Sequence, residues 1–216
     1  MAITTEAIAK AVGEVRSKTK KRNFVQSIDL AINLKDLDME KPENRIDDEI
    51  VLPHGRGREV KIAIIAEGEM AHQAKKLVNR VVEKDELEEL AKDKKEAKKM
   101  AEENDFFISQ ADLMPTVGRF LGPVLGPRGK MPKPVPPTAN IKPLVARLKK
   151  TVKIRSKDNA TFHLGVAMEG MEDKGIVENI EAVIKFLEDK LEKGSNNIKS
   201  IYLTSTMGPS IRIGEK

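Results

Sequence analysis

Apolar and polar residues alternate through segment 24–34 of the chain. Phe24, Ile28, Leu30, Ile32 and Leu34 fall on one side of this pattern, and Ser27, Asp29 and Asn33 fall on the other. Because the side chains of an extended strand point alternately to its two faces, the pattern predicts a half-buried strand. Similar shorter runs predict strands at 49–52, 151–155, 160–168, 198–204 and 211–213.

Apolar residues spaced about one helical turn apart predict helices beside these strands. Thr4 or Thr5 can cap a helix that runs to about Ser17. Residues 176–191 are strongly amphipathic, and we expect Gly194 to end that helix.

The middle of the chain has a different pattern. Residues 60–66 are almost continuously apolar, which is typical of a strand buried on both faces of a parallel sheet, and 105–109 is a second such strand. Helices are predicted at 69–82, 83–103, 111–120 and 140–150, with an irregular segment at 131–137. Strands alternating with helices indicate a small open α/β domain over residues 67–156.

The two ends of the chain share a strand-and-helix character that the middle lacks. We therefore expect residues 1–66 and 157–216 to form one discontinuous α+β domain, into which residues 67–156 are inserted. The fold class is α/β, with two domains. The two crossings would lie side by side and act as a hinge.

Glycine and proline interrupt the apolar residues of segment 118–132, which reads GRFLGPVLGPRGKMP. Each proline removes a backbone donor and fixes φ, so this segment cannot run as one regular helix. We expect a constrained loop against a core, with Arg119, Arg128 and Lys130 facing outward. A phosphate-binding P-loop is excluded, because Val124 replaces its first glycine and Met131 its Mg²⁺-binding hydroxyl residue.

The composition limits the chemistry that the chain can perform. It contains no cysteine, which excludes disulfides, thiol catalysis and cysteine-ligated zinc. His54, His72 and His163 lie far apart, and no acid/base or nucleophilic constellation is visible. We expect no catalytic residue, no metal and no cofactor. No apolar run of 18 residues occurs, so we expect neither a membrane span nor a signal peptide.

The charge indicates a nucleic-acid partner. The net charge is +5 and the pI about 9.2. Residues 67–156 carry 19 Lys+Arg and 13 Asp+Glu, whereas residues 1–66 and 157–216 together carry 20 and 21, which sums to −1. Basic residues cluster at 16–22 and 147–157, where two solvated helix ends would explain them equally well.

The run 204–212, TSTMGPSIR, brings hydroxyls, Met207 and Gly208 to a corner between a strand and a turn. Hydroxyls bind sugars and phosphates, Met207 offers an adaptable apolar contact, and Gly208 lets a partner's backbone come close. Such a corner suits RNA, which is recognised through shape, 2′-hydroxyls and phosphates. An ordinary hairpin turn has the same composition, so both interpretations stay open.

Segments 118–132 and 204–213 together resemble the ribosomal protein L-one family of the lateral stalk of the large ribosomal subunit. Segments 24–34 and 52–55 are also similar to it, and the resemblance spans essentially the whole chain. The run LGPRGKMP at 125–132 is the most specific part. Lys130 and the short length resemble the archaeal branch.

The resemblance implies a terminal-built domain with a Rossmann-like insertion. It also implies a cytoplasmic, ribosome-bound protein that is a monomer when free. Its partners would be the stalk region of large-subunit rRNA, exit-site tRNA, whose release it would assist, and its own mRNA, in the leader or coding region, whose translation it would repress.

The resemblance places the main RNA site in the terminal-built domain. By position, the central contacts are Thr206, Met207 and Gly208, with Ser200 on the preceding strand and Phe24 and Ser27 on the first strand. We extend this RNA-binding site to neighbouring cations that would contact phosphates, Lys21, Arg22, Arg155, Lys157, Lys199 and Arg212, and to His163. Arg119, Arg128 and Lys130 are candidates for a secondary RNA contact, unless their loop only shapes the side of the middle domain that faces the cleft. Because the terminal-built domain sums to −1, recognition would depend on local clusters and shape.

Two alternatives come from other functional classes. The inserted domain alone would fit a small nucleotide-using α/β enzyme, although a fold does not fix a function. The basic charge would also fit a DNA-binding regulator.

Overall fold

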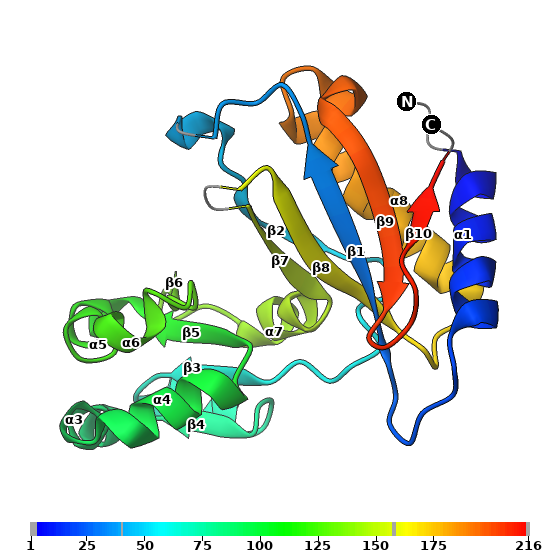
Figure 1. The fold of residues 1–216 in the computed structure, drawn as a ribbon. Helices are drawn as coiled ribbons and strands as arrows, with labels where there is room; N and C mark the ends of the chain where they lie inside the picture. Colours follow the sequence, from blue (N-terminus) through cyan, green and yellow to red (C-terminus); the bar gives the residue numbers. More distant parts are fainter. Residues whose placement is uncertain (1–3, 40, 157–158, 215–216) are drawn as a thin grey trace. The chain divides into compact units, whose positions relative to one another are not determined.

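The computed structural model describes residues 4–39, 41–156 and 159–214, and the chain forms two compact units (Figure 1). We call Met1–Arg58 with Lys150–Lys216 the terminal unit, and Glu59–Lys149 the middle unit. The fold is a mixed α/β fold, as expected from the sequence.

The terminal unit contains a four-stranded sheet of order β10-β9-β1-β8 in which all neighbours are antiparallel. Its strands are β1 (Ser27–Leu34), β8 (Thr161–Met168), β9 (Ile198–Ser205) and β10 (Ile211–Ile213). Every second residue of β1 is buried, which is the alternation that the sequence shows. The sheet therefore has one apolar face and one polar face.

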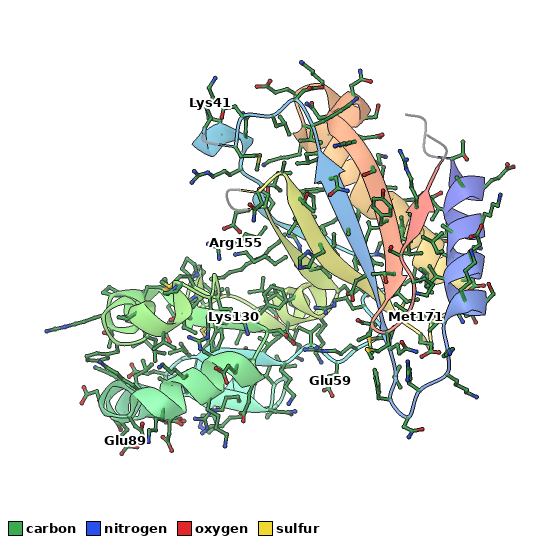
Figure 2. All side chains as sticks on the ribbon, viewed as in Figure 1. Lys41, Glu59, Glu89, Lys130, Arg155 and Met171 are labelled. Atoms are coloured by element: carbon green, nitrogen blue, oxygen red, sulfur yellow. The ribbon has the colours of Figure 1, made fainter. Side chains whose placement is uncertain are left out.

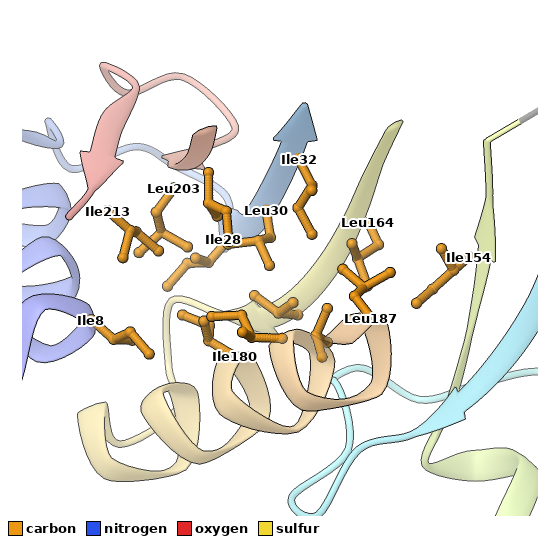
Figure 3. Close-up of a cluster of buried hydrophobic side chains, with 14 of the residues drawn as sticks. Ile8, Ile28, Leu30, Ile32, Ile154, Leu164, Ile180, Leu187, Leu203 and Ile213 are labelled. Atoms are coloured by element: carbon orange, nitrogen blue, oxygen red, sulfur yellow. The ribbon is translucent and has the colours of Figure 1, made fainter. Parts of the chain in front are cut away.

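Two helices cover the apolar face. Helix α1 (Thr5–Lys18) is capped by Thr4, whose hydroxyl accepts from Ala7 N, and α8 is the helix Asp173–Lys190. Their buried residues join those of the sheet in one core, where Ile8 of α1 and Ile180 of α8 lie beneath the strands (Figure 3). A small antiparallel sheet of β2 (Asp47–Val51) and β7 (Thr151–Arg155) packs into the same core.

Short elements complete the terminal unit. The 3₁₀ turns are η1 (Pro42–Asn44) and η3 (Gly194–Asn197). Helix α8 ends at Lys190, before Gly194, which begins η3 instead of ending the helix as predicted. The predicted strands 151–155 and 160–168 are β7 and β8, and they belong to different sheets, because β7 pairs with β2 and β8 pairs with β1.

The middle unit is built on a parallel sheet of order β4-β3-β5-β6. Its strands are β3 (Ile62–Ile65), β4 (Arg80–Val82), β5 (Phe106–Gln110) and β6 (Lys133–Val135). One apolar cluster joins the sheet to α2 (Gly68–Lys75) and α7 (Ile141–Lys149). A second joins it to α3 (Lys84–Lys92), α4 (Lys94–Glu103), α5 (Met114–Phe120) and α6 (Gly122–Leu125), with η2 (Ala111–Leu113) before α5.

The middle unit differs from the sequence prediction in three places. The predicted helix 69–82 is α2 followed by β4, and the predicted helix 83–103 is two helices because Asp93 caps α4 through Lys95 N and Glu96 N. Segment 131–137 contains β6 at a sheet edge, where a strand tolerates Pro134. Short strands such as β4 and β6 form by pairing, which local periodicity does not report.

The chain passes between the units at 58/59 and 149/150, whereas the sequence analysis places the crossings near 66 and 157. Strand β3 pairs with β4 and β5, and β7 pairs with β2, so pairing decides to which unit each strand belongs. Leu52 N donates to Lys150 O at 2.9 Å, and therefore the two connections leave the terminal unit side by side.

Candidate nucleic-acid interface

The end of β9 forms a corner with the start of β1. Thr206 N donates to Ser27 O at 3.1 Å, and Ser27 N donates to Thr206 Oγ1 at 2.9 Å. Thr206 and Met207 are both exposed at this turn. We call residues 206–208 with Ser27 the corner.

A loop of six residues, 20–25, is fastened to the corner at both of its ends. At one end, the hydroxyls of Thr19 and Ser205 lie 2.8 Å apart. At the other, Gln26 Nε2 donates to Lys20 O at 3.1 Å, and Gln26 Oε1 accepts from Met207 N at 3.1 Å. The backbone that carries the loop is therefore fixed against the corner.

Gln26 was not among the residues selected from the sequence. Its side chain is completely buried, and its amide connects the loop to the corner. A signal for it exists, because position 26 falls on the buried side of the alternation, where a polar residue needs internal hydrogen-bond partners.

Three large apolar side chains are exposed on the loop and the corner, those of Phe24, Val25 and Met207. Phe24 is 52% exposed and Met207 is 59% exposed. The sequence analysis places Phe24 on the buried face of the first strand; this part of the prediction is wrong, because β1 begins only at Ser27 and Phe24 lies in the loop. Exposed aromatic and thioether groups side by side with polar groups are typical of a binding surface.

Gly208 is required by the corner itself. A Cβ atom at this position would lie 2.1 Å from Ser205 Oγ and 2.6 Å from Thr19 Oγ1. The space above Gly208 is thus filled by the hydroxyls that fasten the loop, and the glycine serves the internal packing instead of the approach of a partner's backbone that we expected.

The predicted cations differ in their surroundings. Lys21 and Arg22 are exposed on the loop at residues 20–25. Arg212 faces Tyr202 across β10 and β9, and its Nε atom is buried with no hydrogen-bond partner among the described residues. Arg155, which is labelled in Figure 2, lies in the smaller sheet with its Nε atom 3.4 Å from Asp47 Oδ2. Lys157 lies outside the described residues.

Ser200 and Lys199 lie at the far end of β9. Thr206 comes six positions after Ser200, which is about 20 Å along an extended strand. The Ser200 side chain is buried, and its hydroxyl accepts from Asn33 Nδ2 at 2.9 Å, while Lys199 is exposed. His163 is exposed on β8, opposite Ala31 of β1. Among the predicted site residues that the structure describes, Lys21, Arg22 and Phe24 thus lie on the loop that is fastened to the corner residues, and the others lie elsewhere.

The glycine- and proline-rich segment is largely helical, because α5 and α6 follow each other with a break at Leu121. Its cations are not all directed outward. Lys130 Nζ donates to the carbonyls of Ala101 and Asn104, each at 2.8 Å, at the end of α4. Arg128 forms an ion pair with Glu102 at 3.0 Å, whereas Arg119 is exposed on α5.

The parallel sheet of the middle unit has a switch point between β3 and β5, which is where such folds bind nucleotides. The polar groups there bind each other: Glu67 N donates to Gln110 Oε1 at 3.1 Å, and Gln110 Nε2 donates to Asp112. Acidic Glu67 precedes α2 at the place where a phosphate would bind. This geometry does not favour the nucleotide-using alternative.

The connection at residues 53–58 is held on α8. The buried Asn179 accepts from His54 N at 3.1 Å and donates to Gly55 O at 2.7 Å. His54 Nε2 lies 2.5 Å from Glu178 Oε2, and this hydrogen bond lowers the pKa of the Glu178 carboxyl. Arg56 is thereby placed over β8, where its guanidinium lies above Gly165.

Within the described ranges, no group of three histidine and acidic side chains could hold a metal ion. Nor is any described helix long and apolar enough to cross a bilayer.

Comparison with known proteins decides the family. The sequence profile of the ribosomal protein L1p/L10e family matches residues 16–209. The chain belongs to this family. Relatives named large ribosomal subunit protein uL1 are similar over almost their whole length. The protein of Methanothermococcus thermolithotrophicus is 57% identical over 208 residues, covering 96% of this chain and 98% of the relative.

Two further relatives give the same result. The protein of Methanothermobacter thermautotrophicus is 54% identical over 209 residues, covering 96% of this chain and 99% of its own. That of Pyrococcus horikoshii is 51% identical over 214 residues, covering 99% and 98%. Membership of this family of structural ribosomal proteins makes the chain a structural protein and not an enzyme, and the archaeal relatives agree with the branch expected from the sequence.

Proposed function

We propose that the protein is a structural constituent of the large ribosomal subunit and that it binds the stalk region of large-subunit rRNA through the corner and the adjoining loop. The observation that carries this proposal is the exposure of Phe24 and Met207 on a loop and a turn whose backbones are joined through hydrogen bonds of Gln26. RNA-binding proteins use such groups to stack on unpaired bases and to fill the spaces between riboses.

The charges on the loop support the same proposal. Lys21 and Arg22 extend from a backbone that is fastened at Thr19 and Gln26. Phosphate contacts by these two side chains would release counterions and supply affinity that does not depend on sequence. Since hydrogen bonds already hold both ends of the loop in the free chain, less conformational entropy is lost when RNA binds than for a loop with free ends.

The more distant candidates would extend this surface. Ser200, Lys199, Arg212 and His163 lie on the large sheet, and Arg155 lies on β7 of the smaller sheet; Lys157, outside the described residues, remains a candidate by its position in the sequence. We propose that they contact RNA only when it is long enough to follow the sheet away from the corner. Arg119 and Arg128 are the exposed members of the predicted secondary site, and Arg128 is also paired with Glu102.

Two finer roles are proposed on the family alone. The protein would assist release of exit-site tRNA from the ribosome. It would also repress translation of its own mRNA by binding there an RNA structure similar to its rRNA site, because a surface that reads RNA shape binds the same shape in another molecule. We place it in the cytoplasm on the ribosome, and as a monomer when free.

A competition experiment tests the main proposal. The purified chain is mixed with a labelled transcript of large-subunit rRNA, and unlabelled duplex DNA of equal length or Mg²⁺-ATP is added. We expect the rRNA to stay bound and ultraviolet crosslinks to form on peptides that contain Phe24 and Met207. Displacement by duplex DNA would favour the DNA-binding regulator, and tight Mg²⁺-dependent ATP binding the nucleotide-using enzyme; either result would contradict the proposal.

A further inference from the structure

One methionine joins the connection at residues 53–58 to the core of the terminal unit. Met171, labelled in Figure 2, lies in the turn at residues 169–172 between β8 and α8, half-buried and packed against that core. A Cβ atom at Gly57 would lie 2.7 Å from both Cγ and Sδ of Met171. The thioether therefore fills the space beside Gly57, whose φ of 70° is one that glycine adopts without strain.

The turn that carries Met171 is fixed by polar contacts at both of its ends. At its start, Glu169 N donates to Gln26 O at 2.9 Å, and the Glu169 carboxylate accepts from Gln26 N at 3.3 Å. At its end, the Arg16 guanidinium donates to Met171 O and forms an ion pair with Asp173 at 2.6 Å. Because moving the turn would break these contacts, a change in the Met171 side chain must be accommodated by the connection that it touches.

The connection is held in different ways along its length. Hydrogen bonds hold residues 53–55: Lys150 Nζ donates to Pro53 O at 3.1 Å, and Asn179 Nδ2 donates to Gly55 O at 2.7 Å. At Gly57, the apolar contact with Met171 takes over this role. A change at the thioether would therefore act on residues 56–58 and leave residues 53–55 in place.

A thioether can be oxidised in a way that changes such a contact. The chain contains no cysteine, so its nine methionines carry all of its sulfur. The sulfur lone pair attacks hydrogen peroxide, one peroxide oxygen is transferred to sulfur, and the other leaves as water. Sulfur is oxidised by two electrons and the peroxide is reduced by the same two. The sulfoxide is larger and polar, it disrupts apolar contacts, and enzymes can reduce it back to the thioether.

We propose that Met171 is a site of reversible oxidation by hydrogen peroxide, and that its sulfoxide releases residues 56–58 from the turn at residues 169–172. A sulfoxide oxygen that is turned toward the apolar core would lack a hydrogen-bond donor, which is costly. It gains hydrogen bonds by turning toward solvent, on the side where the exposed Gly57 lies. The connection between the two units would then contain a longer free segment when Met171 is oxidised.

Limited proteolysis of the full chain tests the inference, because trypsin cleaves after Arg56 only when the backbone there leaves its neighbours. The chain is treated with hydrogen peroxide, and mass spectrometry of its peptides locates the sulfoxides. We expect Met171 to be oxidised and cleavage after Arg56 to become about 10-fold faster, because cleavage follows the population of the open form. Cleavage after Arg155, on the paired strand β7, should not change. Treatment with methionine sulfoxide reductases should restore the slow rate.

Three variants separate Met171 from the other methionines. Met171→Leu keeps an apolar side chain of similar volume without sulfur, so cleavage after Arg56 should be slow before and after peroxide. Met131→Leu is the matched control: it removes a thioether that is 45% exposed in the middle unit, and it should respond to peroxide as the wild type does. Met171→Gln puts a polar group in the same place and should be cleaved about 10-fold faster without peroxide. Circular dichroism and thermal unfolding of each variant show that the fold is intact.

Four outcomes would overturn the inference. If Met171 stayed unoxidised while Met131 and Met207 were fully oxidised, it would not be a modification site. Oxidised Met171 with unchanged cleavage after Arg56 would mean that the sulfoxide does not release the connection. Equal acceleration in Met171→Leu would assign the effect to another methionine, and equal acceleration after Arg155 would mean general unfolding. None of these measurements uses RNA, so their outcome is independent of the proposed function.

Discussion

Two regions of this chain looked alike in sequence and differ in structure. The corner at residues 206–208 and the segment at residues 118–132 both combine glycine, proline and polar residues. At the corner, internal hydrogen bonds use the backbone and the buried Gln26, and leave Met207 and Phe24 exposed. In segment 118–132, Lys130 and Arg128 themselves make the internal bonds.

The comparison teaches that residue type alone does not separate binding from folding. A lysine that donates to two carbonyls at a helix end stabilises the unit that contains it, because helix ends leave carbonyls without intrahelical partners. An exposed methionine on a turn fixed by its backbone stabilises nothing in the free protein. We therefore expect changes at the two regions to have opposite effects on stability and on RNA affinity.

The largest expected effect is at Gly208. Gly208→Ala places a Cβ atom against Ser205 Oγ and Thr19 Oγ1; such overpacking costs about 1–3 kcal/mol of unfolding free energy. Because the turn must move, RNA affinity should fall more than about 10-fold as well. Calorimetry measures the unfolding free energy, and filter binding measures the RNA affinity. Gly170→Ala is the control, since no atom lies within 4 Å of its added Cβ. A Gly208→Ala variant with wild-type stability would show that the hydroxyls do not fill this space.

Next comes Lys130, where stability and binding should separate. Lys130→Met removes two charge-assisted hydrogen bonds to α4, which are worth about 1.5–3 kcal/mol in total once the lost solvation of the carbonyls is included. Hydrogen exchange of α4 amides should rise while RNA affinity stays the same. Arg119→Met, on the exposed side of α5, is the matched control for the hydrogen-exchange measurement. If Lys130→Met lost RNA affinity without faster hydrogen exchange, Lys130 would be an RNA-binding residue, and the difference proposed between the two regions would be wrong.

Met207→Ala should lower RNA affinity and leave the stability of the free protein almost unchanged. Its side chain is 59% exposed, so the unfolding free energy should change by less than about 0.5 kcal/mol. Loss of the apolar contact with RNA should weaken binding by about 10-fold, or about 1.4 kcal/mol. Thermal unfolding measures the change in stability, and filter binding on the same preparation measures the change in RNA affinity. Unaltered affinity would remove Met207 from the interface.

The smallest single-residue effect concerns two arginines with different surroundings. Arg22 is exposed on the loop, whereas Arg155 is paired with Asp47. Arg22→Ala should reduce the slope of log affinity against log salt by about one, as expected for one phosphate contact. Arg155→Ala should reduce it less, because Asp47 already neutralises part of its charge. Equal slopes for the two variants would show that the ion pair opens when RNA binds.

The sequence predicts those parts of the fold that rest on periodicity. The alternation at β1 and the caps and apolar face of α1 and α8 give these elements within a few residues. Strands β4 and β6 could not be predicted, because three residues carry no period and their pairing with β3 and β5 is long-range.

The candidate site shows the same limit. The resemblance implies Thr206 and Met207 as RNA contacts, and this stays a prediction. It did not select Gln26, whose signal in the sequence is a polar residue on the buried side of the alternation and whose hydrogen-bond partners only the structure shows. Nor could the sequence show that Lys130 is committed to α4, since its partners are backbone carbonyls, which every residue possesses.

The most direct test of the account asks whether the terminal unit binds RNA alone. Because Leu52 and Lys150 are hydrogen-bonded, Arg58 can be joined to Lys150 by a short Gly-Ser linker, which leaves the core of the unit complete. We predict that this folded chain binds large-subunit rRNA within about threefold of the full-length affinity, a difference of less than about 0.7 kcal/mol. A folded terminal unit that does not bind, with binding retained by residues 59–149, would contradict the account.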